Sequence, residues 1–151
     1  VAGLFHVFNV LANKDSEYTT FDATDYDSIM RQPGCMIMGV TSVKDVENET
    51  AISNALKKNL EKTLLAEGFD LTTATGAACI VVGSEEIFEE TVGLMDSIEF
   101  GFDTLATLTG GAMVHRGIYE DSNKDKLVTY TLISGLNRPS KRIEGLKKFL
   151  K

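Results

Sequence analysis

The sequence predicts an α+β fold in which a mixed four-stranded sheet packs with two long helices, preceded by the end of a buried central helix. Short apolar runs bounded by turn residues recur along the chain, as buried strands do. Two longer stretches between them place apolar residues three or four positions apart, the spacing of an amphipathic helix. The 151 residues are enough for one domain with its own core.

Composition and charge restrict the possible partners. Hydrophobic residues make up 43% of the chain and charged residues 25%, as in ordinary globular proteins. The formal net charge is −7, which disfavours nucleic acid because phosphate binding needs a basic surface. Basic residues gather in the segment from Arg138 to Lys151. We therefore expect membrane contact only indirectly or through this basic tail.

The first twelve residues are apolar on nearly every side. This stretch is too short to span a bilayer and lacks the flanks of a signal peptide, so we expect the end of a buried helix. We also expect the chain to be part of a longer protein, cut where a central helix joins two domains. Unless a partner domain covers them, Leu4, Phe5, Phe8 and Leu11 should form an exposed apolar patch.

Three carboxylates, Asp22, Asp25 and Asp27, crowd the start of the next helix, which we predict over residues 23–32, before Pro33 and Gly34. Asp22 is placed to act as the N-cap, with Asp25 three residues later in the first turn. In another interpretation, Asp22 and Asp25 lie one turn apart and together orient a water molecule. A cation site is less suited, because the spacing does not follow a calcium-loop pattern.

The remaining elements follow in order. Residues 35–41 and 77–83 are short runs that are apolar on both faces, as central strands are. Long amphipathic helices are predicted over 44–67, which Gly68 would end, and over 84–101, which Ser84 would cap. Strands near 112–119 and over 127–135 are separated by one polar loop, which predicts an antiparallel hairpin. We expect a helix over 140–151 that rests its apolar side on the domain and exposes its lysines.

The histidines and cysteines are expected to be structural. His6 and His115 have no partner at metal-ligand spacing, and a zinc site needs three or four convergent ligands. Cys35 and Cys79 lie in apolar runs without a C-x-x-C spacing, so we expect core thiols in a reducing cytoplasm.

Four stretches together resemble the C-terminal domain of the tubulin/FtsZ superfamily over nearly the whole chain. They are Asp22-x-x-Asp25, Met30-x-x-x-Gly34-x-x-x-Met38-Gly39, Ala51-Ile52-Ser53 and Val128-Thr-Tyr-Thr-Leu-Ile-Ser-Gly135. Bacterial members have Asn where Thr20 stands, and many have a basic residue at the place of Asp27. The pattern is therefore similar to a divergent branch, such as archaeal FtsZ-like or CetZ-like proteins.

This resemblance implies the C-terminal, GTPase-activating and polymerisation domain of a cytoskeletal GTPase. Asp22 and Asp25 would be catalytic residues that act on the GTP of the adjacent subunit in a head-to-tail homopolymer. GTP and Mg²⁺ would bind in the N-terminal domain of the longer protein and not in this domain, because Gly110-Gly111 is not followed by a phosphate-binding helix. Whether the filament serves cell division or another process stays open.

The resemblance also implies a division of the chain. Residues 1–13 would end the central helix, 14–22 would form the catalytic loop, 23–137 the α+β domain and 138–151 a basic helix. The alternative is a stand-alone ligand-binding or regulatory α/β module that oligomerises through its sheet edge, with the Asp cluster serving only as a cap. A free-standing small enzyme is poorly supported, because the sequence shows no nucleophile–base pair.

Overall fold

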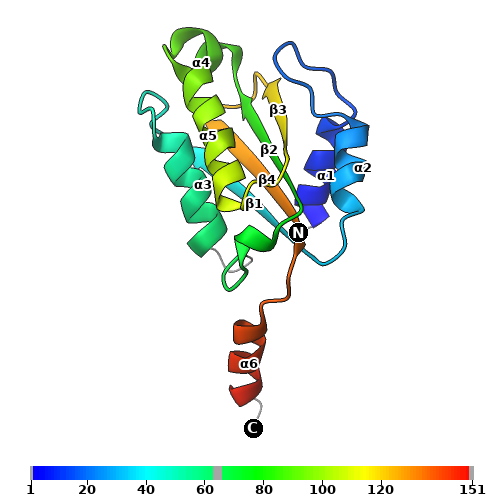
Figure 1. The fold of residues 1–151 in the computed structure, drawn as a ribbon. Coiled ribbons are helices and arrows are strands. Elements are labelled where there is room, and N and C mark those ends of the chain that lie inside the picture. Colours follow the sequence, from blue (N-terminus) through cyan, green and yellow to red (C-terminus); the bar gives the residue numbers. More distant parts are fainter. Residues whose placement is uncertain (1, 63–65, 150–151) are drawn as a thin grey trace.

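The computed structural model describes residues 2–62 and 66–149 and has the predicted α+β fold (Figure 1). A four-stranded sheet lies between two layers of helices. In chain order the elements are α1 (Ala2–Leu11), α2 (Ala23–Met30), β1 (Cys35–Val43), α3 (Ala51–Lys62), the short 3₁₀ helix η1 (Leu71–Thr73), β2 (Gly76–Gly83), α4 (Glu85–Glu90), α5 (Leu94–Leu108), β3 (Val114–Glu120), β4 (Leu127–Leu136) and α6 (Ser140–Phe149).

The sheet has the strand order β1-β4-β2-β3. β4 is antiparallel to both β1 and β2, whereas β3 is parallel to β2, so the predicted mixed sheet is confirmed. Every residue of β2 is buried, and its side chains alternate between the cores on the two faces. This explains why its sequence is apolar without interruption.

The predicted hairpin between β3 and β4 is wrong, because β2 lies between these two strands. The fully apolar β2 takes the central place, whereas β3 carries His115 and Arg116 and takes an edge. The polar loop after β3 therefore crosses two strand spacings, about 10 Å, instead of one. The sequence also predicts β1 as a central strand. It forms the other edge, although Ile37 and Met38 are buried on its two faces.

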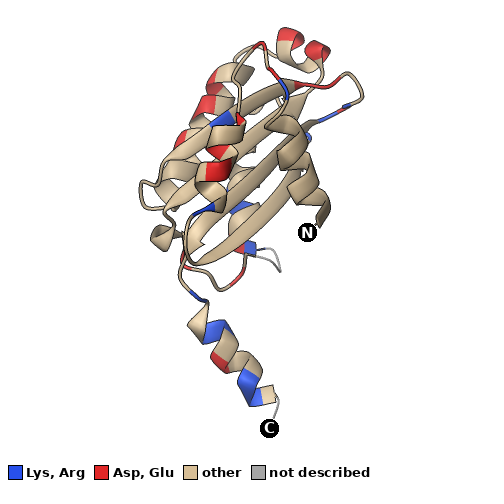
Figure 2. Cartoon of the chain, turned by 90° about the vertical axis from the view of Figure 1, so that its right-hand side faces the viewer, with Lys and Arg blue, Asp and Glu red and all other residues tan. Residues whose placement is uncertain are grey.

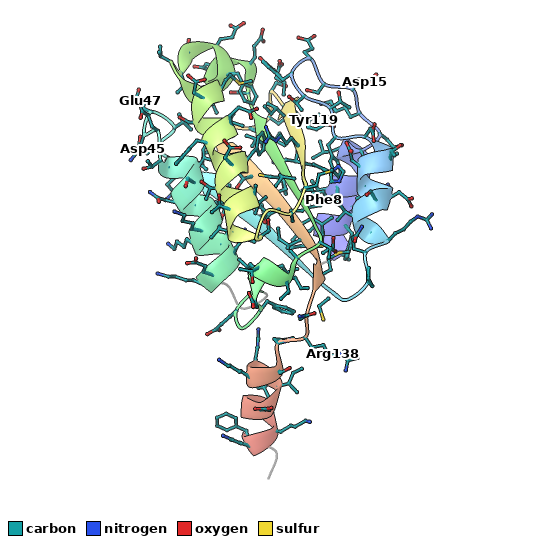
Figure 3. The ribbon with its side chains drawn as sticks, viewed as in Figure 1. Phe8, Asp15, Asp45, Glu47, Tyr119 and Arg138 are labelled. Atoms are coloured by element: carbon teal, nitrogen blue, oxygen red, sulfur yellow. The ribbon has the colours of Figure 1, made fainter. Side chains whose placement is uncertain are left out.

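Each face of the sheet has its own core. One core lies between the sheet and helices α3 and α5, and the other between the sheet and α1 and α2 (Figure 1). In the second core Phe8 of α1 is fully buried, and it points toward the sheet in Figure 3. Its ring lies 6.1 Å from that of Phe21, which precedes α2. Burial of these rings joins the start of the chain to the sheet.

The first long helix is shorter than predicted. α3 begins at Ala51 rather than near residue 44, because the side chain of Asn48 accepts hydrogen bonds from the backbone and hydroxyl of Thr50. Such a local turn competes with helix formation. The predicted end falls partly on residues 63–65, which lie outside the described residues. Gly68 has a φ of +89°, a conformation that glycine adopts without strain.

The second long helix is two helices. α4 ends at Glu90, and α5 begins at Leu94 and continues to Leu108, beyond the predicted end at residue 101. The break lies at Gly93, whose φ of +75° interrupts the helical backbone. Val92 beside it is 97% exposed.

The two ends of the chain also differ from the prediction. In α1, Phe8 and Leu11 are buried in the core, whereas Leu4 and Phe5 are half-buried, so the predicted exposed patch is wrong for two of its four residues. Helix α6 projects from the domain and has no buried residue (Figure 1). The prediction that its apolar side rests on the domain is therefore wrong.

Charge is divided between the two ends of the domain. Lys and Arg predominate on α6, whereas Asp and Glu gather on the outer helices and at the opposite end (Figure 2). Among the described residues, no helix is both long and apolar enough to cross a membrane.

Candidate active-site loop

The segment between α1 and α2 lies along the exposed edge of β3. The backbone N–H of Ile118 donates to the carbonyl of Thr19 over 2.8 Å, forming an isolated antiparallel bridge. The hydroxyl of Ser16 donates to the carbonyl of Ile118, and the ammonium of Lys14 donates to the carbonyl of Glu120 over 3.0 Å. The segment thus uses the hydrogen-bonding groups that an edge strand leaves unpaired.

Tyr119 fixes the residue that precedes the carboxylates. Its hydroxyl accepts a hydrogen bond from the backbone N–H of Phe21 over 2.8 Å and donates one to the carbonyl of Phe21 over 2.9 Å. Both residues are fully buried, so one hydroxyl satisfies two backbone groups that water cannot reach. Figure 3 shows Tyr119 on β3, between the sheet and the loop that carries Asp15.

The surroundings of Tyr119 change its acidity. Burial raises the pKa of the Tyr119 phenol above its usual value, and the nearby charges of Asp25, Asp15 and Asp22 raise it further. The hydrogen bond from Phe21 acts in the opposite direction. The phenol therefore stays protonated at neutral pH and can both donate and accept.

Gly117 leaves the space that the loop needs. A Cβ atom at this position would lie 2.9 Å from the Cβ of Phe21 and 2.9 Å from the ring of Tyr119. Because side chains alternate along a strand, His115, Gly117 and Tyr119 share one face of β3, and this face meets the loop and the start of α2.

Asp22 and Asp25 form the capping box of α2. The backbone N–H of Asp25 donates to Oδ1 of Asp22 over 2.8 Å, and the backbone N–H of Asp22 donates to Oδ2 of Asp25 over 3.1 Å. The predicted N-cap is confirmed. Asp22 is exposed, and its second oxygen has no hydrogen-bond partner among the described residues.

His115 contacts Asp25, a partner that its spacing along the chain does not reveal. Its Nδ1 lies 2.7 Å from Oδ1 of Asp25, and the two side chains are 15% and 30% exposed. The two residues are 90 positions apart, and no spacing rule connects them. The sequence signal that could have revealed this contact is the alternation of His115, Gly117 and Tyr119, which places the three residues on one face of an edge strand. His6 lies exposed on α1, and no described residue is hydrogen bonded to it.

Two other polar residues of the Asp-rich stretch have local roles. Oδ2 of Asp27 accepts from Nε of Arg31 over 2.5 Å, one turn away on the exposed side of α2. Asp27 therefore does not join the Asp22–Asp25 pair. The hydroxyl of Thr20 accepts from the backbone N–H of Ser16 over 3.3 Å, within the loop.

The cysteines lie in the sheet, as expected. Cys79 on β2 is fully buried, and burial raises the pKa of its thiol to about 12. Cys35 at the start of β1 is half-buried. A thiol that stays protonated at neutral pH packs as a small hydrophobic group.

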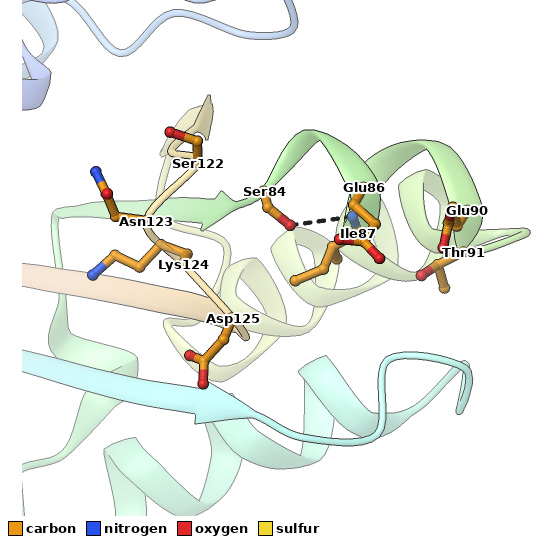
Figure 4. A pocket seen from close by; sticks show the side chains of 9 residues that line it. All are labelled: Ser84, Glu86, Ile87, Glu90, Thr91, Ser122, Asn123, Lys124 and Asp125. Carbon is orange, nitrogen blue, oxygen red and sulfur yellow. Dashed lines mark hydrogen bonds between the residues drawn. The ribbon is translucent and has the colours of Figure 1, made fainter.

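A concave region lies between α4 and the turn after β3 (Figure 4). Its volume is about 500 Å³, and its polar lining includes Glu86, Glu90, Lys124 and Asp125. The hydroxyl of Ser84 is used to cap α4, where it accepts from the backbone N–H of Ile87. Within 2–62 and 66–149, no group of three or more His, Cys, Asp or Glu is arranged to hold a metal ion.

Comparison with known proteins identifies the fold family. A family model described as the C-terminal domain of the tubulin-like protein TubZ matches residues 19–140. The chain belongs to this family. The expected tubulin/FtsZ superfamily is confirmed, and the match narrows it to TubZ. A comparison with curated proteins found no match.

Solved structures agree with this assignment. A GTPγS-form protofilament of TubZ from Bacillus thuringiensis serovar israelensis has a TM-score of 0.74 at 20% identity, over 95% of this chain and 36% of that chain. FtsZ from M. jannaschii has a TM-score of 0.63 at 22% identity, over 85% of this chain and 38% of that chain. CetZ2 from Haloferax volcanii has a TM-score of 0.63 at 15% identity, over 88% of this chain and 41% of that chain. At these identities the likeness shows the fold, and the TubZ-family chain spans little more than a third of those proteins.

Proposed function

We propose that this TubZ-family domain is the hydrolysis-completing part of a cytoplasmic GTPase that polymerises head to tail. In this proposal Asp22 and Asp25 act on GTP bound by the adjacent subunit. Residues 1–13 end a central helix that leads from an N-terminal GTP-binding domain, and residues 14–22 form the catalytic loop. Residues 23–137 form the domain that presents this loop, and residues 138–151 form a basic tail that contains α6.

The observation that carries the proposal is the combination of exposure and fixation at the loop. Asp22 is exposed and Asp25 is half-buried, so both lie where a second molecule can reach them. The backbone before them is held by Tyr119 and by the bridge between Thr19 and Ile118. Catalytic groups need such fixation, because small displacements are costly in rate.

The carboxylates suit the orientation of a water molecule. An ionised carboxylate has about four acceptor positions, and the capping box uses one on Asp22. The remaining oxygen of Asp22 can accept a hydrogen bond from the attacking water. The water oxygen would bond to the γ-phosphorus as the bond to the β–γ bridging oxygen breaks, which releases GDP and phosphate.

The described residues do not suit a binding site for the nucleotide itself. Gly110 and Gly111 follow the C-terminal end of α5, so they present no helix N-terminus to a phosphate. Asp25 already accepts on both oxygens. GTP and its Mg²⁺ are therefore proposed to lie in the N-terminal domain, and no step is assigned to the metal here.

The relatives support a polymer. Solved TubZ structures include protofilaments in GDP and GTPγS forms and helical filaments. In a head-to-tail contact, two different surfaces of each subunit meet, and repetition without closure gives a filament. Hydrolysis at this contact would then depend on assembly.

The test is replacement of the carboxylates in the full-length protein. We expect Asp25→Ala and Asp22→Ala to lower GTP turnover by about 10² or more, measured by phosphate release, while sedimentation still detects filaments. Asp25→Asn is the milder variant, because its amide oxygen can still accept from the backbone of Asp22.

Asp27→Ala is the matched control, because Asp27 lies on the same helix and pairs with Arg31. Its turnover should equal that of the parent. If Asp25→Ala forms filaments and turns over GTP within about twofold of the parent, the carboxylates are only a helix cap and the catalytic assignment is wrong.

A further inference from the structure

The capping box of α2 is complete without His115. Each of its two carboxylates accepts from the backbone N–H of the other residue, which is all that helix capping requires. The contact between His115 and Asp25 is an additional one, made from β3 rather than from the helix. Its purpose therefore needs a separate explanation.

The additional contact restricts how Asp25 is oriented. A carboxylate held through one oxygen can still rotate about its terminal torsion, which has a broad energy well. In Asp25, Oδ2 accepts from the backbone N–H of Asp22 over 3.1 Å, and Oδ1 lies 2.7 Å from Nδ1 of His115. Partners on both oxygens, one from the helix and one from the sheet, fix the carboxylate plane.

The contact also determines where the imidazole carries its proton. An ionised carboxylate only accepts hydrogen bonds, so Nδ1 of His115 must be the donor. The side chain is 15% exposed, so few other arrangements are open to it. Gly117 and Tyr119 on the same face of β3 hold Phe21, directly before Asp22. One strand face thus holds the peptide before the first carboxylate and the side chain of the second.

We propose that His115 is a positioning residue for GTP hydrolysis, which orients Asp25 by donating Nδ1–H to its Oδ1. The role rests on the proposed function of Asp22 and Asp25. His115 does not contact the nucleotide or the attacking water, and it acts through Asp25.

The neighbouring residue provides a control on the same strand. Arg116 lies on the opposite face of β3, where its guanidinium is 2.5 Å from a carboxylate oxygen of Glu99. It also lies 5.3 Å from the centre of the Phe102 ring on α5. Replacing Arg116 perturbs β3 without touching the loop.

The experiment compares three replacements of His115 in the full-length protein. Asn places its amide donor near the position of Nδ1, Gln places it one bond further out, and Phe has no donor. We expect His115→Phe and His115→Gln to lower kcat for GTP about tenfold to a hundredfold, with KM unchanged. His115→Asn should stay within about threefold of the parent, and Arg116→Gln should equal it.

A spectroscopic measurement on the 151-residue chain tests the contact independently of turnover. Nitrogen-15 NMR of His115 should show the Nδ1–H tautomer in the parent, and Asp25→Ala should shift the tautomer away from it. An unchanged tautomer would overturn the contact.

The outcomes separate this inference from the proposed function. If Asp25→Ala abolishes turnover but His115→Phe does not lower it, the positioning role is overturned and the proposed function stands. If His115→Asn is as impaired as His115→Phe, a donor at Nδ1 is not what matters, and the inference again fails. If Asp25→Ala turns over GTP like the parent, the proposed function and the positioning role both fail.

Discussion

The loop over residues 14–22 and helix α6 differ in how they are held in place: the loop has no regular structure but is fixed, whereas α6 is regular but not packed. The loop over residues 14–22 forms no helix or strand of its own, yet hydrogen bonds tie it to Ile118, Tyr119 and Glu120 of β3. Helix α6 has ten residues of regular helix and no buried side chain. A segment of this molecule is therefore held in place by the surface on which it packs, and not by its own helix or strand structure.

The physical reason lies in the backbone. A loop leaves its N–H and C=O groups unpaired, and the edge of β3 offers matching groups. A helix pairs its own backbone, so it needs apolar burial to be held. In α6, Leu146 is 57% exposed and Phe149 is 88% exposed, so little apolar surface is removed from water. The guanidinium of Arg142 donates to the carbonyl of Glu67, in the turn that follows α3, over 2.8 Å.

Within the two regions compared, the largest effect is expected from breaking the contact of Tyr119 with Phe21, here called the Tyr119 clamp. Tyr119→Phe leaves the buried N–H and C=O of Phe21 unpaired and should lower the free energy of unfolding by about 3 kcal/mol. Urea unfolding of this chain measures the difference. Tyr130→Phe is the matched control, because its hydroxyl has no hydrogen bond among the described residues. Equal losses in the two variants would contradict the clamp.

The same clamp predicts a dependence on alkaline pH. Burial raises the pKa of Tyr119 in the folded state above the ordinary tyrosine value of 10.0, so the unfolded chain releases this proton first. The contribution of Tyr119 to stability is fully present below pH 10, near the unfolded pKa, and is lost as pH rises through the raised folded pKa. Unfolding free energies should therefore fall less steeply above pH 10 in Tyr119→Phe than in the parent. Parallel curves would count against the prediction.

An intermediate effect is expected from filling the space at Gly117. Gly117→Ala places a methyl group 2.9 Å from the Cβ of Phe21, which lies close to the backbone and cannot rotate away. We expect a loss of about 2 kcal/mol in the free energy of unfolding. Hydrogen exchange at Phe21 and Asp22 should also become faster, because the loop must move outward. Unchanged exchange at these amides would show that β3 does not hold the loop.

The smallest effect is expected in α6. Replacing Phe149 by Ser should change the free energy of unfolding by less than about 0.5 kcal/mol, because the ring is exposed. Phe8→Ala provides the contrast, since its ring is fully buried and its removal should cost about 3 to 5 kcal/mol. A large effect at Phe149 would mean that α6 packs on the domain in solution.

The sequence predicts most of the helices and strands, but not which strands lie side by side in the sheet. The unbroken apolar run of β2 and the capping pattern at Asp22 are local signals, and both are confirmed. Strand order depends on which strands can be buried on both sides, so the predicted hairpin between β3 and β4 fails. The helix break at Gly93 depends on backbone conformation at one glycine, which amphipathic spacing does not reveal.

At the site, the sequence predicts the carboxylates but not what holds them. Asp22 and Asp25 are three residues apart and form a recognisable pattern. His115 and Tyr119 reach them only because β3 lies at the edge of the sheet, on the side of α2. A contact across 90 residues depends on tertiary structure, and residue spacing along the chain does not reveal it.

The central claim is that Asp22 and Asp25 act on the nucleotide of another molecule, and a mixing experiment tests it most directly. Full-length Asp25→Ala protein should bind GTP without rapid turnover. Adding the 151-residue chain, which carries intact Asp22 and Asp25, should restore phosphate release in proportion to the amount added. The same chain with Asp25→Ala should restore nothing. Equal phosphate release with both chains, or none with either at concentrations where binding is detected, would contradict action between molecules.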